Sequence, residues 1–157
     1  MDSLRLIKNM KHMFLEINFL KMAIKKNITV GGKRKTAIAK ATINNGKGKI
    51  WINKVPYENF DFFKKLMIDE PIEITKKVLG NFKFDIRVNV TGGGSESRIE
   101  ASRLAIARAL VKITKSEPLK RAFSRYDKNL LIADTRRKEA NKPGDSKARK
   151  KRQKSFR

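Results

Sequence analysis

Cysteine is absent from this 157-residue chain, and histidine occurs once, as His12. Without cysteine the chain forms no disulfide and offers no thiolate ligand to a metal. A single histidine leaves little for a histidine-based metal site or for histidine acid–base catalysis. No Ser, Asp or Glu has the companion residues that a catalytic site needs. The sequence therefore predicts a protein that is not an enzyme and that binds no metal or other cofactor.

Acidic residues are scarce, because 15 Asp and Glu stand against 39 Lys and Arg. The resulting net charge of +24 far exceeds what solubility requires, and such a charge repels itself in a compact monomer. We expect a polyanion to supply the counter-charge, with nucleic acid favoured over an anionic membrane. Long apolar runs are also missing, since the stretch 13–24 is too short and too interrupted to span a membrane. The predicted partner is therefore nucleic acid, with no membrane.

Residues 1–27 are predicted to be an N-terminal extension outside the fold. A basic start followed by apolar residues suggests a signal peptide, but no clean apolar core or small-residue cleavage site follows it. One interpretation is an amphipathic helix with Phe14, Ile17 and Leu20 on one stripe. The other is that Met22 is the true start, so that the residues before it are not native.

Residues 28–133, which we call the body, combine strand and helix signals. Two β-rich runs, 29–43 and 49–53, flank a turn with an Asn-Gly pair and should form an antiparallel hairpin. The segment 82–90 alternates strictly between apolar and polar residues, which is typical of a strand with one buried face. Its other face should meet solvent or a ligand. A last short strand is expected at 130–132.

Helical periodicity occupies most of the remaining body. Predicted helices cover residues 60–67, 71–79, 95–114 and 117–126. The break between the first two is placed at Pro71, because proline suits the first turn of a helix and disrupts its interior. The sum is an α+β fold with helices packed on one side of a mainly antiparallel sheet.

Two glycine-rich segments are candidate anion sites. In the first, Gly31–Thr36, the glycines would let a phosphate backbone approach, and Lys33, Arg34 and Lys35 would neutralise it. A solvated basic strand is the alternative, and a P-loop is excluded because the required GxxxxGK[ST] pattern is missing. The second, Gly92–Gly94 before the long helix, is either an anion site at a helix N-terminus or a flexible turn.

Residues 134–157, which we call the arm, contain almost no large apolar side chain. Three acids stand against eleven cations, namely Arg136, Arg137, Lys138, Lys142, Lys147, Arg149, Lys150, Lys151, Arg152, Lys154 and Arg157. Such a segment buries too little surface to offset the entropy of ordering, so we expect it to be extended until it binds a polyanion. Its cations can then reach backbone phosphates at many points. A solubilising tail is the alternative.

Four stretches, taken in order, resemble the ribosomal protein S9 family. They are GKRKTA at 32–37, VTGGG at 90–94 with the helix that contains AIARALV at 105–111, the segment 126–134, and the basic stretch from 136 to the end. Together they span nearly all of the chain from Ile28 onwards. The ending KRQKSFR is similar to the archaeal and eukaryotic cytosolic branch, which commonly ends in KRQKSYR, with Phe156 in place of the tyrosine.

The resemblance implies a ribosomal S5 domain 2-like sandwich and a structural role in the small subunit of the cytoplasmic ribosome. The body would dock on the 3′ major domain of the small-subunit rRNA, beside other proteins of the subunit head. The arm would thread through rRNA, with its cations from Arg136 to Arg152 as anchors, towards the peptidyl-site (P-site) tRNA. Carried over by position, the tRNA contact falls on Arg157, with Lys154 and Ser155 nearby.

Two functions outside this reading are less compatible with the sequence. An architectural DNA- or RNA-binding protein outside the ribosome would be expected to carry basic helices or groove wedges, whereas here the charge is concentrated in an irregular tail. An RNA-processing component such as the ribonuclease P protein would need an Arg-rich helix with an RNR-type signature. The segment 97–110 reads SRIEASRLAIARAL instead.

Overall fold

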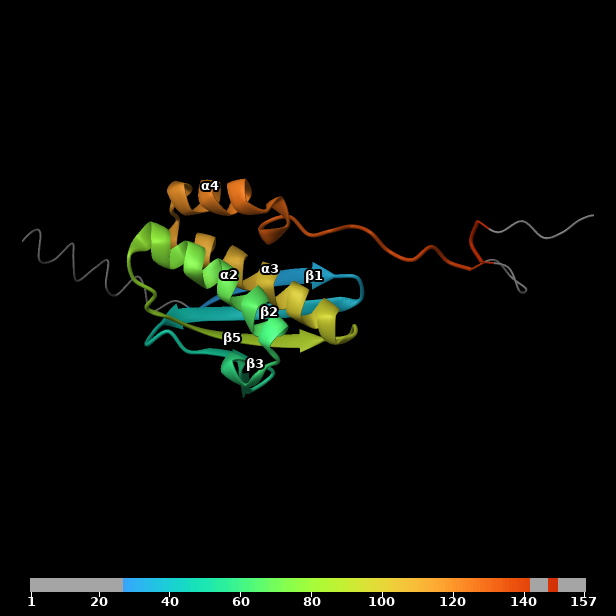
Figure 1. Cartoon of the computed structure of the whole chain (residues 1–157), viewed down its shortest axis with the longest axis horizontal. Coiled ribbons are helices and arrows are strands. Elements are labelled where there is room, and N and C mark those ends of the chain that lie inside the picture. Colours follow the sequence, from blue (N-terminus) through green and yellow to red (C-terminus); the bar gives the residue numbers. More distant parts are fainter. Residues whose placement is uncertain (1–26, 142–146, 150–157) are drawn as a thin grey trace, which may run out of the picture.

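The computed structural model describes residues 27–141 and 147–149. These residues form a five-stranded mixed sheet with helices over one face, and the beginning of the arm leads away from the body as an extended segment (Figure 1). The predicted α+β class is therefore confirmed. The predictions for residues 1–26 and for Lys142, 150–152 and 154–157 lie outside the described residues. None of the helices that are described is long and apolar enough to cross a membrane.

The strand order is β1-β2-β5-β3-β4. The strands are β1 (Ile28–Arg34), β2 (Ala37–Asn45), β3 (Ile50–Ile52), β4 (Val55–Pro56) and β5 (Phe84–Thr91). β2 pairs antiparallel with both β1 and β5, and β4 pairs antiparallel with β3. β3 runs parallel to β5, so the sheet is mixed.

The predicted hairpin between 29–43 and 49–53 is wrong. The first run turns back on itself at Lys35 and Thr36, and its two halves pair as β1 and β2. Lys35 has a φ of 51°, which is in the left-handed region. Turns in this region usually contain glycine, and no glycine at 35 or 36 marks this turn in the sequence. β5 then lies between β2 and β3, so that Val88 is opposite both Ala41 and Ile52.

The chain between β4 and β5 contains a single long helix, α2 (Phe62–Leu79), where two helices were predicted. Pro71 lies inside it, with its ring fully buried, and the hydroxyl of Thr75 donates a hydrogen bond of 2.7 Å to the Pro71 carbonyl. Burial of the ring in the core offsets the loss of the backbone N–H, which the sequence pattern alone could not show. The predicted end at Gly80 is confirmed by its φ of 76°.

The two later helices are confirmed as α3 (Ser95–Thr114) and α4 (Glu117–Tyr126). Ser116 caps α4, since its hydroxyl accepts a hydrogen bond from the Leu119 N–H. The predicted strand at 130–132 is wrong, because a 3-10 turn occupies Lys128–Leu130. The carboxylate of Asp127 accepts from the Asn129 N–H at 2.8 Å and stabilises that turn.

The core lies between the sheet and α3. α3 packs against β1, β2 and β5, while α2 and α4 pack against α3 and against each other (Figure 1). Small side chains allow the close approach, and those buried at this contact include Ala37, Ala39, Ala41, Ala101, Ala105 and Ala109. At Gly32 a Cβ would overlap the Ala101 carbonyl and lie 2.7 Å from the Ala105 nitrogen. The close packing of α3 therefore explains why position 32 is a glycine, and no bound phosphate is needed to account for it.

Candidate nucleic-acid interface

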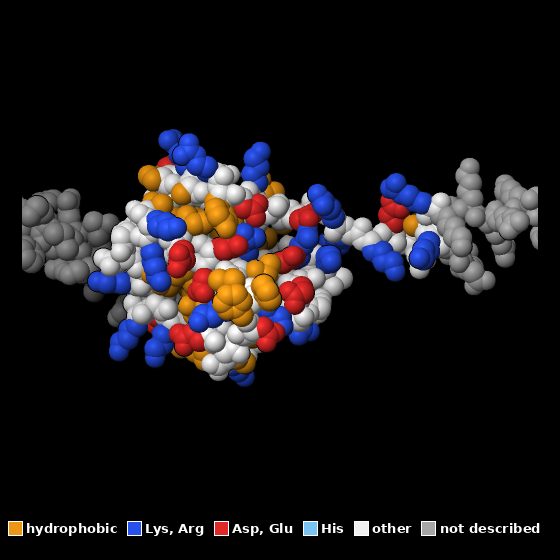
Figure 2. All heavy atoms as spheres, viewed as in Figure 1, with side chains coloured by type: hydrophobic (Ala, Val, Ile, Leu, Met, Phe, Trp, Pro, Cys, Tyr) orange, Lys and Arg blue, Asp and Glu red, His pale blue; other side chains and the backbone are white. Residues whose placement is uncertain are grey.

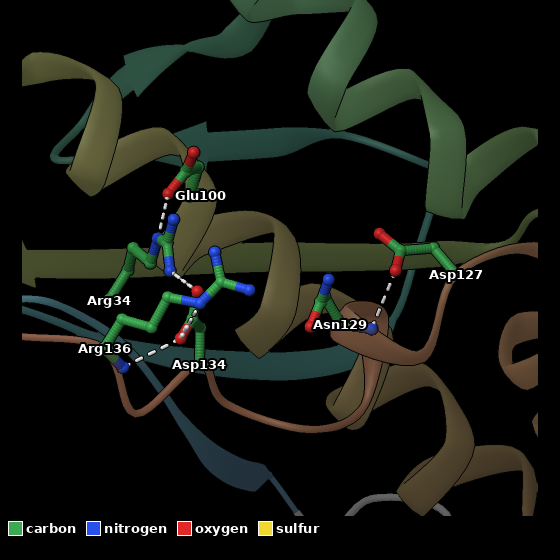
Figure 3. A network of polar contacts seen from close by, with 6 residues as sticks. All are labelled: Arg34, Glu100, Asp127, Asn129, Asp134 and Arg136. Carbon is green, nitrogen blue, oxygen red and sulfur yellow. Dashed lines mark hydrogen bonds and ion pairs between the residues drawn. The ribbon is translucent and has the colours of Figure 1, made fainter.

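Arg34 joins the body to the root of the arm. Its Nε donates to the Glu100 carboxylate on α3, and its Nη1 donates to the carboxylate of Asp134 (Figure 3). Glu100, followed by Asp134, raises the pKa of Arg34 above its ordinary value. Two carboxylates thus balance the charge of Arg34. Of the three predicted cations at 33–35, this one is held in a structural contact.

Asp134 is fixed from a second side by the arm itself. Its Oδ1 accepts a hydrogen bond of 2.8 Å from the backbone N–H of Arg136 (Figure 3). This bond, followed by the one from Arg34, lowers the pKa of the Asp134 carboxyl. The carboxylate therefore stays ionised at neutral pH and holds the first residues of the arm in one direction.

The other predicted cations among the described residues face solvent. Lys33 and Lys35 are exposed on either side of Arg34. Further along, the exposed arm residues are Arg136, Arg137, Lys138, Lys147 and Arg149. Arg149 donates to the Glu139 carboxylate, with Nη2 2.7 Å from Oε1, and it lowers the pKa of that carboxyl. Nε of Arg136 also lies 3.9 Å from Oδ1 of Asp134. The exposed ammonium and guanidinium groups of this set are donors of the kind that phosphate oxygens accept from.

A second ion-pair network lies across a small pocket from the first. Arg103 on α3 contacts the carboxylates of Glu70 on α2 and Asp127, the latter at 3.3 Å. A small polar pocket of about 110 Å³ lies between the two networks, and both Arg34 and Arg103 line it. Among the residues that the structure describes, no group of three or more His, Cys, Asp or Glu is placed to hold a metal ion. The two networks join helices, sheet and arm through ion pairs and hydrogen bonds.

The Gly92–Gly94 segment is a tight turn between β5 and α3. Gly92 and Gly93 have φ values of 71° and 67°, and a Cβ on Gly93 would lie 2.7 Å from the Cβ of Ala37. Nε of Arg98 donates to the Gly92 carbonyl at 3.0 Å. The left-handed backbone and the close contact explain both glycines as parts of the turn.

The face of the sheet opposite the helices carries cations that the sequence reading did not select. Lys40 on β2 lies beside Asn89 on β5, and Arg87 lies between Thr42 and Trp51 on the neighbouring strands. Cζ of Arg87 lies 5.7 Å from the Trp51 ring centroid, a cation–π arrangement.

We call this surface the open sheet face; its residues include Lys33 on the edge strand β1 and, further in, Lys40, Thr42, Trp51, Arg87 and Asn89. Among the described strands, Asp85 is the one carboxylate on it, and its Oδ1 accepts from the backbone N–H groups of Lys47 and Lys49 at 2.8 and 2.9 Å. The alternation of alanine with larger residues over 37–43 was a sequence signal for it. The face is therefore cationic, with an aromatic ring and polar donors in its middle.

Comparisons with known proteins identify the family of the chain. The family model described as "Ribosomal protein S9/S16" matches residues 32–157. The small ribosomal subunit protein uS9 of Desulfurococcus amylolyticus is 44% identical over 137 residues, which covers 84% of this chain and 94% of that protein. The uS9 protein of Methanococcus vannielii is 43% identical over 129 residues, or 80% and 95% of the two chains. The chain thus belongs to the ribosomal protein S9/S16 family.

Proposed function

We propose that this protein is a structural, non-catalytic component of the small ribosomal subunit, that it acts in the cytoplasm and that it binds rRNA. Its relatives are named as small ribosomal subunit proteins, and they align over most of this chain. The net charge of +24 fits a site surrounded by phosphate. Contacts of this kind give an affinity that depends on salt and little on sequence, while the fold of the RNA sets the docking place.

The observation that carries the proposal is the anchoring of the arm at Asp134. Arg34 and the Arg136 N–H hold its root, and beyond this point the exposed cations continue along an extended chain. An extended cationic segment that starts from a fixed place can follow a groove between RNA helices and contact phosphates on both sides. We assign this role to the predicted anchors from Arg136 to Arg152, with Lys33 and Lys35 beside the root.

The open sheet face supplies a second rRNA contact from the body. Lys40 and Arg87 provide phosphate donors, and Trp51 offers a ring edge and face to a sugar or base. We place this contact in the 3′ major domain of the rRNA, as the family resemblance implies. Other proteins of the subunit head are the remaining neighbours.

The end of the arm is directed to the P-site tRNA in this proposal. The residues concerned are Lys154, Ser155 and Arg157, and their support is the family-like ending KRQKSFR. A guanidinium can donate two hydrogen bonds to one phosphate, which suits a contact to a tRNA backbone. The terminal carboxylate repels phosphate, so its neighbours have to orient Arg157.

Sedimentation of ribosomal particles tests the function directly. We expect the full-length protein to remain with small subunits through a high-salt sucrose gradient, because many phosphate contacts and buried protein contacts act together. Release into the free protein fraction, or recovery with bulk DNA or unassembled RNA, would overturn the proposal and favour an architectural protein outside the ribosome.

A further inference from the structure

The first two turns of α2 expose large apolar side chains. Phe62, Phe63 and Leu66 have relative exposures of 68%, 78% and 46%. The two phenyl rings pack edge to face, with centroids 5.7 Å apart. Figure 2 shows an apolar patch over α2 in the middle of the face that is viewed, with acidic side chains and some Lys and Arg around it. We call these three residues the α2 patch.

The packing of α2 does not require the α2 patch. The helix buries Ile68, Pro71, Ile72 and Thr75 against the rest of the body. At about 100° per residue, the α2 patch lies on the opposite side of the helix from these four. Exposure of two phenylalanines and a leucine together is costly in water, and such patches mark interaction sites.

The surroundings of the α2 patch are acidic, in contrast to the rest of the chain. The segment 58–73 contains two lysines and five acids, namely Glu58, Asp61, Asp69, Glu70 and Glu73. Lys64 is already paired with Asp61 at 2.6 Å, and Glu70 with Arg103. Asp69 and Glu73 continue the outward side of the helix from Leu66, at intervals of three and seven residues. A phosphate that approached the α2 patch would meet net negative charge.

We propose that the α2 patch is the docking site of a second, basic protein, which inserts an apolar side chain between Phe62, Phe63 and Leu66. The inference deepens the proposed function, since it assumes that the protein works inside the small ribosomal subunit. RNA is disfavoured as the occupant because single-stranded RNA sites combine aromatic rings with a cationic groove, and here the border is acidic. A Lys- and Arg-rich protein surface has the complementary charge.

The arrangement matches the general anatomy of a protein interface. Aromatic side chains dominate the centre of such interfaces, where water is excluded, and charged residues lie at the border. The acids at the border of the α2 patch would guide and select a cationic partner, while the two rings would supply most of the affinity. The open sheet face and the arm, which are cationic, stay free for RNA. The molecule would then present different surfaces to its two kinds of partner.

Site-specific photo-crosslinking identifies the occupant. Full-length protein with p-benzoylphenylalanine in place of Phe63 is assembled into small subunits, which are purified, irradiated and analysed by mass spectrometry. We expect a crosslink to another ribosomal protein at a Lys- and Arg-rich segment. A crosslink to rRNA, to this same chain or to a second copy of it, or no crosslink at all, would overturn the inference.

A substitution pair adds a quantitative test. Phe62→Ser with Phe63→Ser removes the rings from an exposed position, so the body should still fold. Subunits with this double variant should lose the partner protein that the crosslinking identified several-fold more readily in a salt wash. Lys76→Ser with Lys77→Ser, at the exposed C-terminal end of the same helix, serves as the matched control and should retain it. Equal retention by both variants would also overturn the inference.

The failure of this inference and the failure of the proposed function give different results. If the unmodified protein does not sediment with small subunits, the proposed function is wrong. If it does sediment, and Phe63 crosslinks to RNA or to nothing, the function stands and only the α2 patch has been misassigned.

Discussion

Arg34 donates a hydrogen bond to the carboxylate of Asp134, a residue that follows it by 100 positions in the sequence. The same guanidinium also bonds Glu100 on the central helix α3 (Figure 3). One side chain thus connects the end of β1, the main helix and the root of the arm. The arm therefore leaves the body from a fixed position, although its own residues form no strand or helix over 134–141.

Loss of the Arg34 side chain should release the arm root. In Arg34→Met the carboxylates of Glu100 and Asp134 lose the cation that bridges them, so we expect the free energy of unfolding to fall by about 1 kcal/mol. The heteronuclear NOE of the Arg136 amide should fall, while the helices of the body keep theirs. Lys33→Met, at an exposed neighbouring position, is the control. An unchanged NOE at Arg136 would show that Arg34 does not hold the arm.

The attachment of the arm should depend on pH through Asp134. Its pKa is lowered from the ordinary value of 3.8, first by the Arg136 N–H and then by Arg34. A lowered folded-state pKa means that the stabilisation is complete above 3.8 and is lost as the pH falls through the lower folded value. NMR titration of the Asp134 carboxyl should therefore give a midpoint below 3.8.

The Arg34→Met variant separates the two causes of that shift. Because the backbone N–H of Arg136 is the larger cause, the Asp134 midpoint should return only part of the way to its ordinary value in this variant. A full return would mean that the turn at Asp134–Arg136 does not persist without Arg34.

Gly31 and Gly32 should differ in their sensitivity to the same substitution. A Cβ on Gly32 would overlap the α3 backbone, so Gly32→Ala should destabilise the body by about 1 to 3 kcal/mol in urea unfolding. A Cβ on Gly31 would meet its nearest atom, the Ala39 carbonyl oxygen, at 3.9 Å, so Gly31→Ala should change stability by less than about 0.5 kcal/mol. Equal effects would contradict the assigned packing role of Gly32.

The elements with strong local signals were the ones that sequence reasoning predicted well. α3 has apolar residues over a wide arc of its surface and ends at Thr114 as predicted. α4 has a serine cap followed by a proline in its first turn. β5 has strict alternation, and the alternating residues Ile86, Val88 and Val90 are buried as expected. Each of these signals, whether periodicity or a cap, lies within the helix or strand itself or next to it in the sequence.

The errors concerned relationships between distant parts of the chain. Nothing in the sequence near β3 shows that it pairs with β5 instead of with β2. In that pairing each residue of β3 lies opposite a residue 36 positions later in the chain, as Ile50 does with Ile86. The helix continues through Pro71 because tertiary packing buries the ring, which a propensity argument does not include. In the candidate interface, RNA binding by Arg34 stays a prediction, and its pairing with Glu100 and Asp134 could be seen only in three dimensions.

The open sheet face should contribute measurable affinity for rRNA. Lys40→Ala and Arg87→Ala should each weaken binding to a transcript of the 3′ major domain. Each should also lower the slope of log affinity against log salt by about 1, as expected for one lost phosphate contact. Lys120→Ala on α4 is the matched control, because this lysine is exposed on the helical side and pairs with Glu117. Identical slopes for all three variants would exclude the open sheet face.

The end of the arm should affect tRNA binding separately from assembly. Deletion of 154–157 removes two of the arm's cations and leaves the predicted rRNA anchors up to Arg152, so small subunits should still contain the shortened protein. Their affinity for P-site tRNA in filter binding should fall several-fold, and Arg157→Ala should give a smaller fall. Arg157→Lys should recover only part of the loss, because an ammonium cannot make the two parallel hydrogen bonds of a guanidinium.

The control for this deletion is the anchor variant Lys138→Ala. It should weaken retention of the protein in high salt and leave the tRNA affinity of fully loaded subunits unchanged. If subunits that contain the shortened protein in full amount bind tRNA as the unmodified subunits do, the terminal contact does not exist. If deletion of 154–157 instead prevents incorporation, these residues are part of the rRNA anchor, and the division of the arm into an anchor and a tRNA-contacting end is wrong.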